Sequence, residues 1–216
     1  MKKEISVCWF RRDLRLNDNH ALFQALSGKY PVLPLFVFDP EILDKLSDKQ
    51  DKRVAFIHQS LLKINEVLKG NGSSMYVFHG TVEQVFETLN TQYDVKEVYT
   101  NHDYEPYAIN RDLRVSNLLS SKNIQFKSFK DQVIFEKSEV MKSDGTPYTI
   151  FTPFSRKWKE KFNQTPLVHY PSEIFLTNLL KEVSHPIPSL IDIGFEDIEF
   201  NFSDFNISEE RIKNYE

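Results

Sequence analysis

Five short apolar runs, separated by segments with helical spacing, constrain the fold of this chain more than any other feature. The runs cover residues 5–10, 32–38, 75–78, 95–100 and 124–129. After the second run, apolar residues recur at steps of three and four, as in an amphipathic helix, at Val54, Ile57, Leu61, Ile64 and Leu68. Strands that alternate with helices build a parallel sheet covered on both faces. We therefore predict an α/β fold with a five-stranded, doubly wound parallel sheet of Rossmann type.

Local signals mark the ends of several helices and the end of the regular rhythm. The polar turn of Asn17, Asp18 and Asn19 offers capping side chains for a helix that stops near Gly28, and Thr81 followed by Gln84 predicts a capping box. After Gly145 the rhythm breaks, and a turn with one helix is expected over residues 147–162. We predict one α/β domain over residues 1–165 and an extended connector over residues 166–216.

The connector is too long for a loop inside a compact domain, so we expect it to lead to a domain outside this chain. Its apolar side chains should then have nothing to cover in the chain alone: Phe195, Phe200, Phe202 and Phe205. Residues 172–216 carry 3 basic and 10 acidic side chains. This acidic tail argues against nucleic-acid binding by the chain on its own, because such binding needs a basic surface.

Composition narrows the class of protein further. The 216 residues suffice for one complete core. The apolar stretch near the start is too short for a signal peptide, and none has membrane-spanning length, so the expected setting is the cytoplasm, without a membrane partner. The 6 histidines and 1 cysteine show no metal-ligand spacing, so no metal is expected. Glycine-rich phosphate loops and the nucleophile-elbow motif are absent, which weighs against dehydrogenases, P-loop enzymes and α/β-hydrolases.

Charged residues crowd the end of the first strand. Three arginines and two aspartates follow Phe10 within eight residues, at Arg11, Arg12, Asp13, Arg15 and Asp18. Ligands of open parallel sheets bind at the carboxyl ends of the strands. The cluster is therefore either a charge-paired loop or a rim that faces an anion or a flavin, because arginine offers a planar fork to phosphates and ring carbonyls.

The segment Trp9–Leu22, WFRRDLRLNDNHAL, closely resembles the opening signature of the photolyase/cryptochrome family, whose members repair pyrimidine dimers or sense blue light. Further segments resemble the family in the same order and spacing: residues 35–40, 53–56, 101–107 and 148–154, with Trp158. The resemblance spans about residues 5–165 and extends weakly through Leu190, Gly194 and Phe195.

This resemblance implies an N-terminal light-harvesting domain of a deoxyribodipyrimidine photolyase. In the family, the catalytic FAD and the damaged DNA bind a C-terminal helical domain, which these residues do not include. The implied partners are therefore that helical domain and, for the full-length protein only, damaged DNA. We expect the fragment itself to hold no catalytic residues and to repair no DNA.

The resemblance also implies an antenna chromophore in the α/β domain. Folate-binding members carry an Asn-Glu pair where Tyr107 and Ala108 stand here, so 8-hydroxy-5-deazaflavin, FMN or FAD is favoured over methenyltetrahydrofolate. We do not assume that the isolated fragment retains this chromophore. The predicted cofactor-binding residues are Arg11, Asp13, Phe36, Asp39, Arg53, Asn101, Asp103 and Glu105.

Plainer roles stay open for several of these residues. Asp103 and Glu105 are also suited to cap the helix that follows. Arg53 is equally a solvated arginine of a first helical turn. An alternative role, contact with the helical domain, is open for Arg11, Asp13 and Arg15. We expect packing roles for Trp9 and Trp158.

Two other functions remain alternatives. One is the scaffold domain of a cryptochrome-type blue-light receptor, which an empty antenna pocket would favour. The other is a standalone nucleotide-binding protein of Rossmann type, which tight ATP binding would favour.

Overall fold

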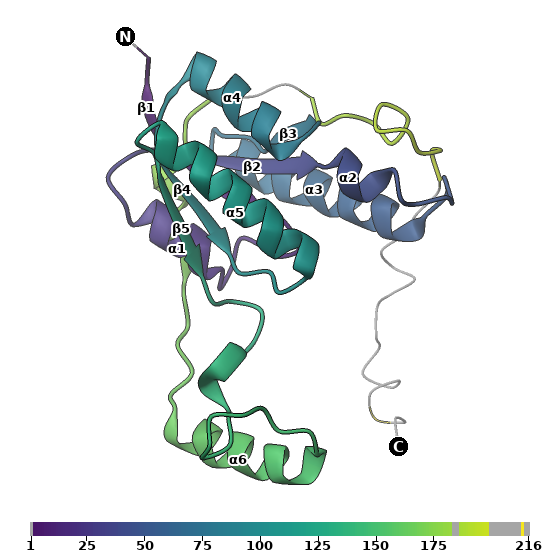
Figure 1. Ribbon diagram of the computed structural model, residues 1–216. Coiled ribbons are helices and arrows are strands. Elements are labelled where there is room, and N and C mark those ends of the chain that lie inside the picture. The colour runs from purple at the N-terminus through teal and green to yellow at the C-terminus, as the bar shows by residue number, and fades with distance from the viewer. Residues whose placement is uncertain (1, 183–185, 199–212, 214–216) are drawn as a thin grey trace.

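The computed structural model describes residues 2–182, 186–198 and 213 of the chain (Figure 1). Its sheet has five parallel strands in the order β3-β2-β1-β4-β5, so the predicted doubly wound α/β fold is confirmed. The strands are β1 (Glu4–Phe10), β2 (Val32–Phe38), β3 (Tyr76–His79), β4 (Asp94–Asn101) and β5 (Gln125–Phe129). The chain order reverses between β1 and β4, which is where open α/β sheets bind ligands.

Helices cover both faces of the sheet. The helices are α1 (His20–Leu26), α2 (Pro40–Leu43), α3 (Lys52–Gly70), α4 (Val82–Gln92), α5 (Pro106–Ser121), α6 (Phe151–Gln164) and the short 3-10 turns η1 (Lys137–Glu139) and η2 (Ser172–Asn178). The predicted caps are confirmed, since the Asn19 side chain accepts from the Leu22 amide and Thr81 forms a capping box with Gln84. In the described part of the chain, no helix combines the length and apolarity needed to cross a membrane.

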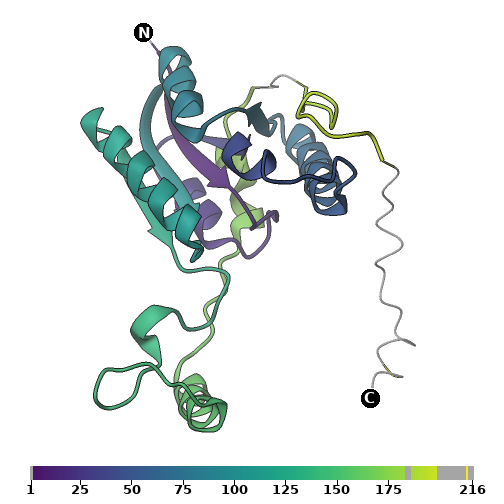
Figure 2. The same cartoon turned by 45° about the vertical axis from the view of Figure 1, so that its right-hand side comes forward.

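Alternate residues of the strands point to opposite faces, and each face has its own core. On β1, Cys8 and Phe10 pack with α1 and α3, whereas Val7 and Trp9 pack with α4 and α5. Figure 2 shows the teal α5 and the blue α3 on opposite sides of the sheet. Trp9 is 2% exposed and meets the Phe86 ring edge-on at 5.8 Å, which confirms it as a packing residue.

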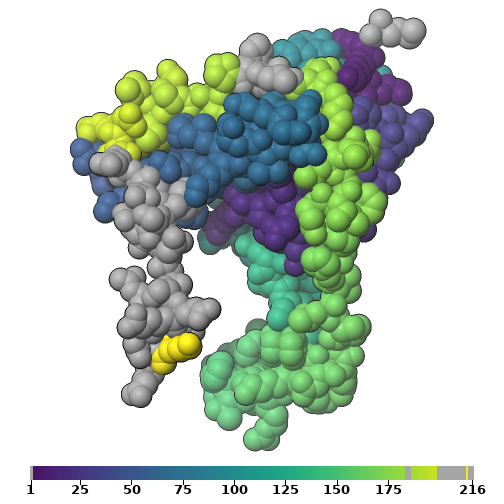
Figure 3. All heavy atoms as spheres, turned by 180° about the vertical axis from the view of Figure 1, so that it is seen from behind, coloured from purple at the N-terminus to yellow at the C-terminus, as the bar shows by residue number. Residues whose placement is uncertain are grey.

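From residue 170 on, the described parts of the predicted connector pack on the α/β body. Leu179 pairs with Val32 beside β2, and the Leu180 amide donates to the Val32 carbonyl at 2.7 Å. Residues 186–198 lie against α3, as the yellow-green and blue atoms show in Figure 3. The expectation that Phe195 would have nothing to cover is wrong, because it is 5% exposed in the core with α3. Phe200, Phe202 and Phe205 lie outside the described residues.

Residues 130–169, named the arm here, extend away from the sheet and carry η1 and α6 (Figure 1). None of the residues of α6 is buried. Trp158 contacts the rings of Phe135 and Phe162 within the arm, at 5.5 and 5.1 Å, which is the packing role predicted for it. The start of α6 is open to solvent, with Ile150 66% and Phe151 77% exposed.

Candidate ligand-binding site

A cavity of about 600 Å³ opens at the carboxyl edge of the sheet. It is lined by the ends of β1 and β2, by the loop between β4 and α5, and by residues of α2, α3 and α5. This is the edge at which doubly wound folds bind ligands, and the volume is typical of sites for small molecules. Six of the eight predicted residues line it: Arg11, Phe36, Asp39, Arg53, Asp103 and Glu105.

The acidic residues of the cavity already have partners within the chain. Asp39 is 5% exposed, caps α2 by accepting from the Glu41 amide at 3.0 Å, and accepts a hydrogen bond from the Tyr107 hydroxyl. Burial raises the pKa of Tyr107, and the hydrogen bond to Asp39 raises it further. Tyr107 is therefore a neutral donor that fixes the carboxylate of Asp39 at the cavity wall.

Asp103 and Glu105 form a second acidic group, which pairs with Arg12. Arg12 lies 3.5 Å from Asp103 and 3.7 Å from Glu105, and its side chain is 63% exposed. Asp103 also accepts from the Glu105 amide at 3.2 Å, whereas the Glu105 side chain makes no capping bond to α5. The capping role left open for this pair is therefore not seen, because α5 has no side-chain capping bond and Asp103 accepts only from the amide of Glu105, which precedes the helix.

Arg53 lies at the rim of the cavity. Its side chain is 75% exposed, and its Nε donates to Asp51 at 3.0 and 3.1 Å. It therefore lines the cavity while being a solvated, ion-paired arginine of the first turn of α3. Both roles considered from the sequence are compatible with this position.

Two buried arginines on the cavity wall share one carboxylate. Nη1 of Arg11 lies 2.7 and 2.6 Å from the two carboxylate oxygens of Asp112, and Nε and Nη2 of Arg111 donate to the same group at 3.1 and 2.9 Å. The guanidinium carbons of Arg11 and Arg111 lie 5.0 and 4.7 Å from the centre of the Trp9 ring. Such contacts between a guanidinium and an aromatic ring are favourable and fix the plane of the guanidinium.

Sequence reasoning noted Tyr107 only as a departure from the folate-binding pattern, and it identified neither Arg111, which lines the cavity, nor Asp112, which holds Arg11 and Arg111 in place. Tyr107 and Arg111 stand four residues apart on α5, and residues at this spacing lie on the same face of a helix. That spacing is the signal in the sequence that could have placed them together. Asp112 is found only through its contact with Arg11, 101 residues away in the chain.

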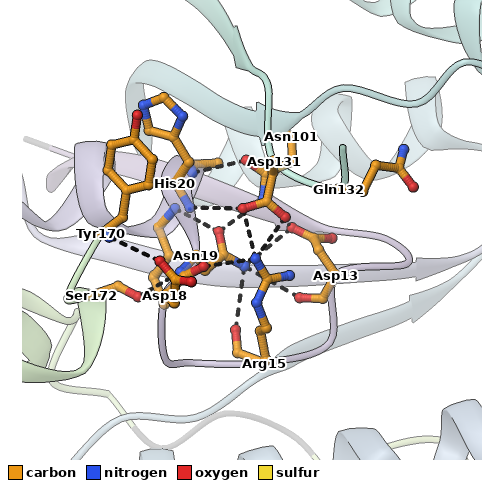
Figure 4. Close-up of polar contacts among 12 residues, drawn as sticks. Asp13, Arg15, Asp18, Asn19, His20, Asn101, Asp131, Gln132, Tyr170 and Ser172 are labelled. Atoms are coloured by element: carbon orange, nitrogen blue, oxygen red, sulfur yellow. Dashed lines mark hydrogen bonds and ion pairs between the residues drawn. The ribbon is translucent and has the colours of Figure 1, made fainter. Parts of the chain in front are cut away.

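The other two predicted residues, Asp13 and Asn101, line a separate cavity of about 80 Å³. Asn101 donates to Asp13 at 2.6 Å and to Asn19 at 2.9 Å, and its own oxygen accepts from the Ala21 amide. The amide of Arg11 donates to Asp13 at 2.8 Å. These bonds hold the loop after β1 to the end of β4 (Figure 4).

Arg15 and His20 connect the same loop to the start of the arm (Figure 4). Arg15 donates to both oxygens of Asp131 at 2.8 Å, and the His20 amide donates to the same carboxylate at 3.1 Å. The His20 ring stacks on Tyr170 with 3.7 Å between ring centres. Within the range of residues that the structure describes, no three His, Cys, Asp or Glu side chains gather into a metal site.

Comparisons with known proteins agree on one family. The profile of the DNA photolyase family matches residues 6–172. The deoxyribodipyrimidine photo-lyase of Synechococcus sp. is 30% identical over 194 residues, which cover 87% of this chain and 40% of that protein. Cryptochrome-2 of Arabidopsis thaliana is 30% identical over 154 residues, which cover 70% of this chain and 25% of that protein.

Solved structures give the same result. An archaeal photolyase from Sulfolobus tokodaii, crystallised with two FAD molecules, matches with a TM-score of 0.65 at 28% sequence identity. The match covers 85% of this chain and 42% of the archaeal one. This chain therefore spans less than half the length of the photolyases that it matches.

Proposed function

This chain belongs to the DNA photolyase family, and we propose that it is the light-harvesting domain of a deoxyribodipyrimidine photolyase. The observation that carries the proposal is the cavity of about 600 Å³ at the carboxyl edge of the sheet, with six residues already implicated by the family resemblance on its wall. When bound there, an antenna chromophore would absorb light and pass the excitation to the catalytic FAD.

The lining of the cavity fits a flat ring system with polar edges. Apolar side chains from the end of β2, α2, the loop that follows α2 and the start of α3 form much of it: Phe36, Phe38, Ile42, Leu43, Leu46, Val54 and Ile57. Carboxylates and guanidinium groups lie at its margins, where they can accept from a ring N–H or donate to a ring oxygen. A flavin or deazaflavin combines a flat apolar surface with such edges.

Two observations favour 8-hydroxy-5-deazaflavin, FMN or FAD over methenyltetrahydrofolate. Tyr107 and Ala108 stand where folate-binding members have Asn and Glu; here Tyr107 donates to Asp39, and Ala108 is 2% exposed. In addition, the structure of the Sulfolobus tokodaii photolyase is described as implying a novel light-harvesting cofactor, with two FAD molecules in the protein. A second flavin in that relative supports a flavin-type antenna here.

The catalytic FAD and the repair of pyrimidine dimers belong, in this proposal, to the part of the photolyase that this chain does not cover. The chain spans 40% of the Synechococcus photolyase. We therefore expect no photorepair from these 216 residues alone. Binding to damaged DNA is likewise proposed for the longer protein only.

The arm is the proposed contact with the helical C-terminal domain. It presents exposed apolar side chains at both ends of α6: Ile150, Phe151, Leu167 and Val168, which are 62–77% exposed. The photolyases matched by this chain are more than twice as long, so they contain a region that could cover such a surface. Burial of side chains of this size would stabilise the contact by roughly 1.5–3 kcal/mol each.

A chimera tests this contact, with these 216 residues followed by the helical half of the Synechococcus photolyase. Hydrogen exchange of the α6 amides should be slower in the chimera than in the chain alone, while α4, which is far from the arm, serves as the reference. Equal exchange of α6 in both proteins would show that the helical domain does not cover the arm.

Chromophore capture tests the antenna itself. The purified chain is incubated with FMN, FAD, 8-hydroxy-5-deazariboflavin and methenyltetrahydrofolate together, passed through a desalting column, and the retained chromophore is identified by mass. We expect one flavin-type chromophore per chain. Retention of the folate would overturn the assignment of the antenna, and retention of none would favour the cryptochrome-type scaffold, which the similarity to cryptochrome-2 keeps as the second candidate.

A further inference from the structure

The loop between α2 and α3, residues 44–51, forms part of the wall of the large cavity and is named the wall loop here. Its residues Lys45 and Leu46 line the cavity, and Nζ of Lys45 lies 5.2 Å from the centre of the Tyr107 ring on α5. Six of the eight residues of the loop are exposed, and none is buried. A segment with so few buried side chains depends on contacts with its neighbours to keep its position.

One such neighbour is residues 186–198 of the connector, named the strap here. The Phe195 amide donates to the Leu190 carbonyl at 2.9 Å, which closes the strap into a turn. A ring nitrogen of His58, on α3, donates to the carbonyl of Pro188 at 2.8 Å. Three side chains of the strap are 3–6% exposed and belong to the core with α3: Leu190, Ile193 and Phe195. The strap is therefore anchored on α3.

The strap also contacts the wall loop directly. The Glu196 amide donates to the Lys49 carbonyl at 2.8 Å, and Nε2 of Gln50 donates to the Glu196 carboxylate at 2.6 Å. Nζ of Lys49 lies 4.8 Å from the centre of the Phe195 ring, which is a favourable contact between a cation and an aromatic ring. Figure 3 shows the strap in yellow-green beside the blue segment that contains this loop and α3. The wall loop is thus held by both the main chain and the side chains of the strap.

The cavity lining and the strap share one hydrophobic core. Four side chains of the lining belong to the core that contains Phe195 or pack against it: Leu43, Leu46, Val54 and Ile57. Of the strap residues, all of which the structure describes, none lines the cavity itself. Because protein interiors are closely packed, loss of the strap from this core would loosen the cavity wall. The strap can therefore act on the cavity without touching a ligand.

We propose that Phe195 and Glu196 are positioning residues that hold the wall loop in place, so that docking of the strap and binding in the cavity stabilise each other. The inference rests on the proposed function, which supplies a flavin-type ligand for the cavity, and it adds a means of regulating that site. Coupling between two sites is reciprocal, so a ligand that orders the wall loop also strengthens the docking of the strap. The connector that contains the strap is expected to lead to the helical domain, and it would carry the effect of the ligand towards that domain.

Hydrogen exchange of the ligand-free 216-residue chain tests the positioning role. The amides of Leu46 and Gln50 donate hydrogen bonds at 3.0 and 2.9 Å in the wall loop and report on its opening. Phe195→Ala should speed their exchange about tenfold or more, because the loop loses the buried ring that it packs beside. Glu196→Ala, at an exposed position, should speed it about threefold.

Two variants are the controls for these changes. Ile191→Ala alters a strap residue whose side chain is 69% exposed. Leu180→Ala alters a connector residue that is 1% exposed and packs in the core on the other face of the sheet, so it destabilises the fold without touching the strap. Both should leave exchange of the wall loop within about twofold of the unmodified chain.

Exchange of the unmodified chain with and without a ligand tests the coupling, and it covers the case in which Phe195→Ala does not fold. Saturating FMN or 8-hydroxy-5-deazariboflavin should slow exchange of the Gly194 and Phe195 amides, which donate within the strap, about tenfold. The Leu180 amide, which lies in the connector outside the strap and donates to Val32, is the reference and should change less than about twofold. Glu196→Ala should in turn weaken binding of the same ligand about threefold.

The outcomes distinguish this inference from the function on which it rests. If exchange of the wall loop is the same in Glu196→Ala and a folded Phe195→Ala as in the two controls, the positioning role is overturned. If a ligand binds but the strap amides slow no more than that of Leu180, the coupling is overturned and the antenna site stands. If neither ligand binds, the proposed function fails, while exchange of the ligand-free variants still decides whether the strap positions the wall loop.

Discussion

Two cavities open side by side at the carboxyl edge of the sheet and share Arg11, Arg12 and Asp103 on their walls, yet they are built differently. The smaller one, of about 80 Å³, is surrounded by side chains that pair with one another. Asp13 binds Asn19 and Asn101, and Arg15 binds Asp131. Its polar groups serve to hold three segments of the chain together.

The larger cavity, of about 600 Å³, has many apolar side chains on its walls and charged side chains at its margin. The guanidinium groups of Arg11 and Arg111 share the carboxylate of Asp112 at its wall. The comparison teaches that a cluster of charges at a strand end does not by itself mark a binding site. The indicative feature is the space beside the charges, lined in large part by apolar side chains.

The largest expected effect comes from disrupting the hydrogen bonds around the small cavity. Asp13→Ala should lower the free energy of unfolding by about 3 kcal/mol, because the buried Asn101 amide and the Arg11 amide lose their acceptor together. Urea denaturation followed by circular dichroism measures this. Asp44→Ala, at an exposed position after α2, should cost less than about 0.5 kcal/mol. A loss for Asp13→Ala as small as that of the control would show that the network does not support the fold.

A medium effect is expected on the pH dependence of stability near the small cavity. Burial raises the pKa of Glu136, but hydrogen bonds from Tyr104 and His102 outweigh it and hold the pKa below its ordinary value. The folded state therefore binds fewer protons than the unfolded state once the pH falls below about 4.3, so acid reduces stability until Glu136 itself is protonated.

Glu136→Gln should remove this part of the acid sensitivity, about 1 kcal/mol or less, while leaving the remaining slope intact. Urea midpoints at pH 6 and pH 3.5 give the comparison. Glu66→Gln, whose side chain is 74% exposed and pairs with Lys69, is the control. An unchanged difference between the two pH values in Glu136→Gln would show that the contacts of Glu136 do not matter for stability.

The smallest expected effect concerns the contribution of the cavity rim to ligand binding. Arg53→Ala should weaken binding of a flavin-type ligand by about threefold or less, because Arg53 is 75% exposed, solvated and already paired with Asp51. Fluorescence titration of the chain with FMN and with 8-hydroxy-5-deazariboflavin measures it. A loss of tenfold or more would mean that Arg53 turns inward over the ligand. The main polar contact with the ligand would then lie at the rim of the cavity and not on its wall.

Much of the fold could be predicted because its signals are local. The apolar run from Val32 to Phe38 has the same first and last residues as β2. The capping box was predicted from Thr81 and Gln84, which are three residues apart in the sequence. The burial of Phe195 could not be predicted, because it depends on a partner surface on α3 more than 100 residues earlier. Apolar side chains in an irregular segment give no local indication of what they cover.

The candidate site was only partly predictable for the same reason. Residues at strand ends, such as Asp39 and Asp103, could be assigned to one edge of a parallel sheet from their positions in the sequence. Arg111 and Asp112 lie within α5, where a charged pair looks like ordinary helix surface. Their importance depends on the approach of Arg11 and Trp9 from β1, which only the tertiary structure shows.

A crystal structure of the chain grown with FMN and, separately, with 8-hydroxy-5-deazariboflavin tests the central claim most directly. We predict a ring system within the large cavity, while the bonds among Asp13, Asn19 and Asn101 stay as they are. A ligand bound outside the large cavity, or one that enters by breaking the network of the small cavity, would contradict the account.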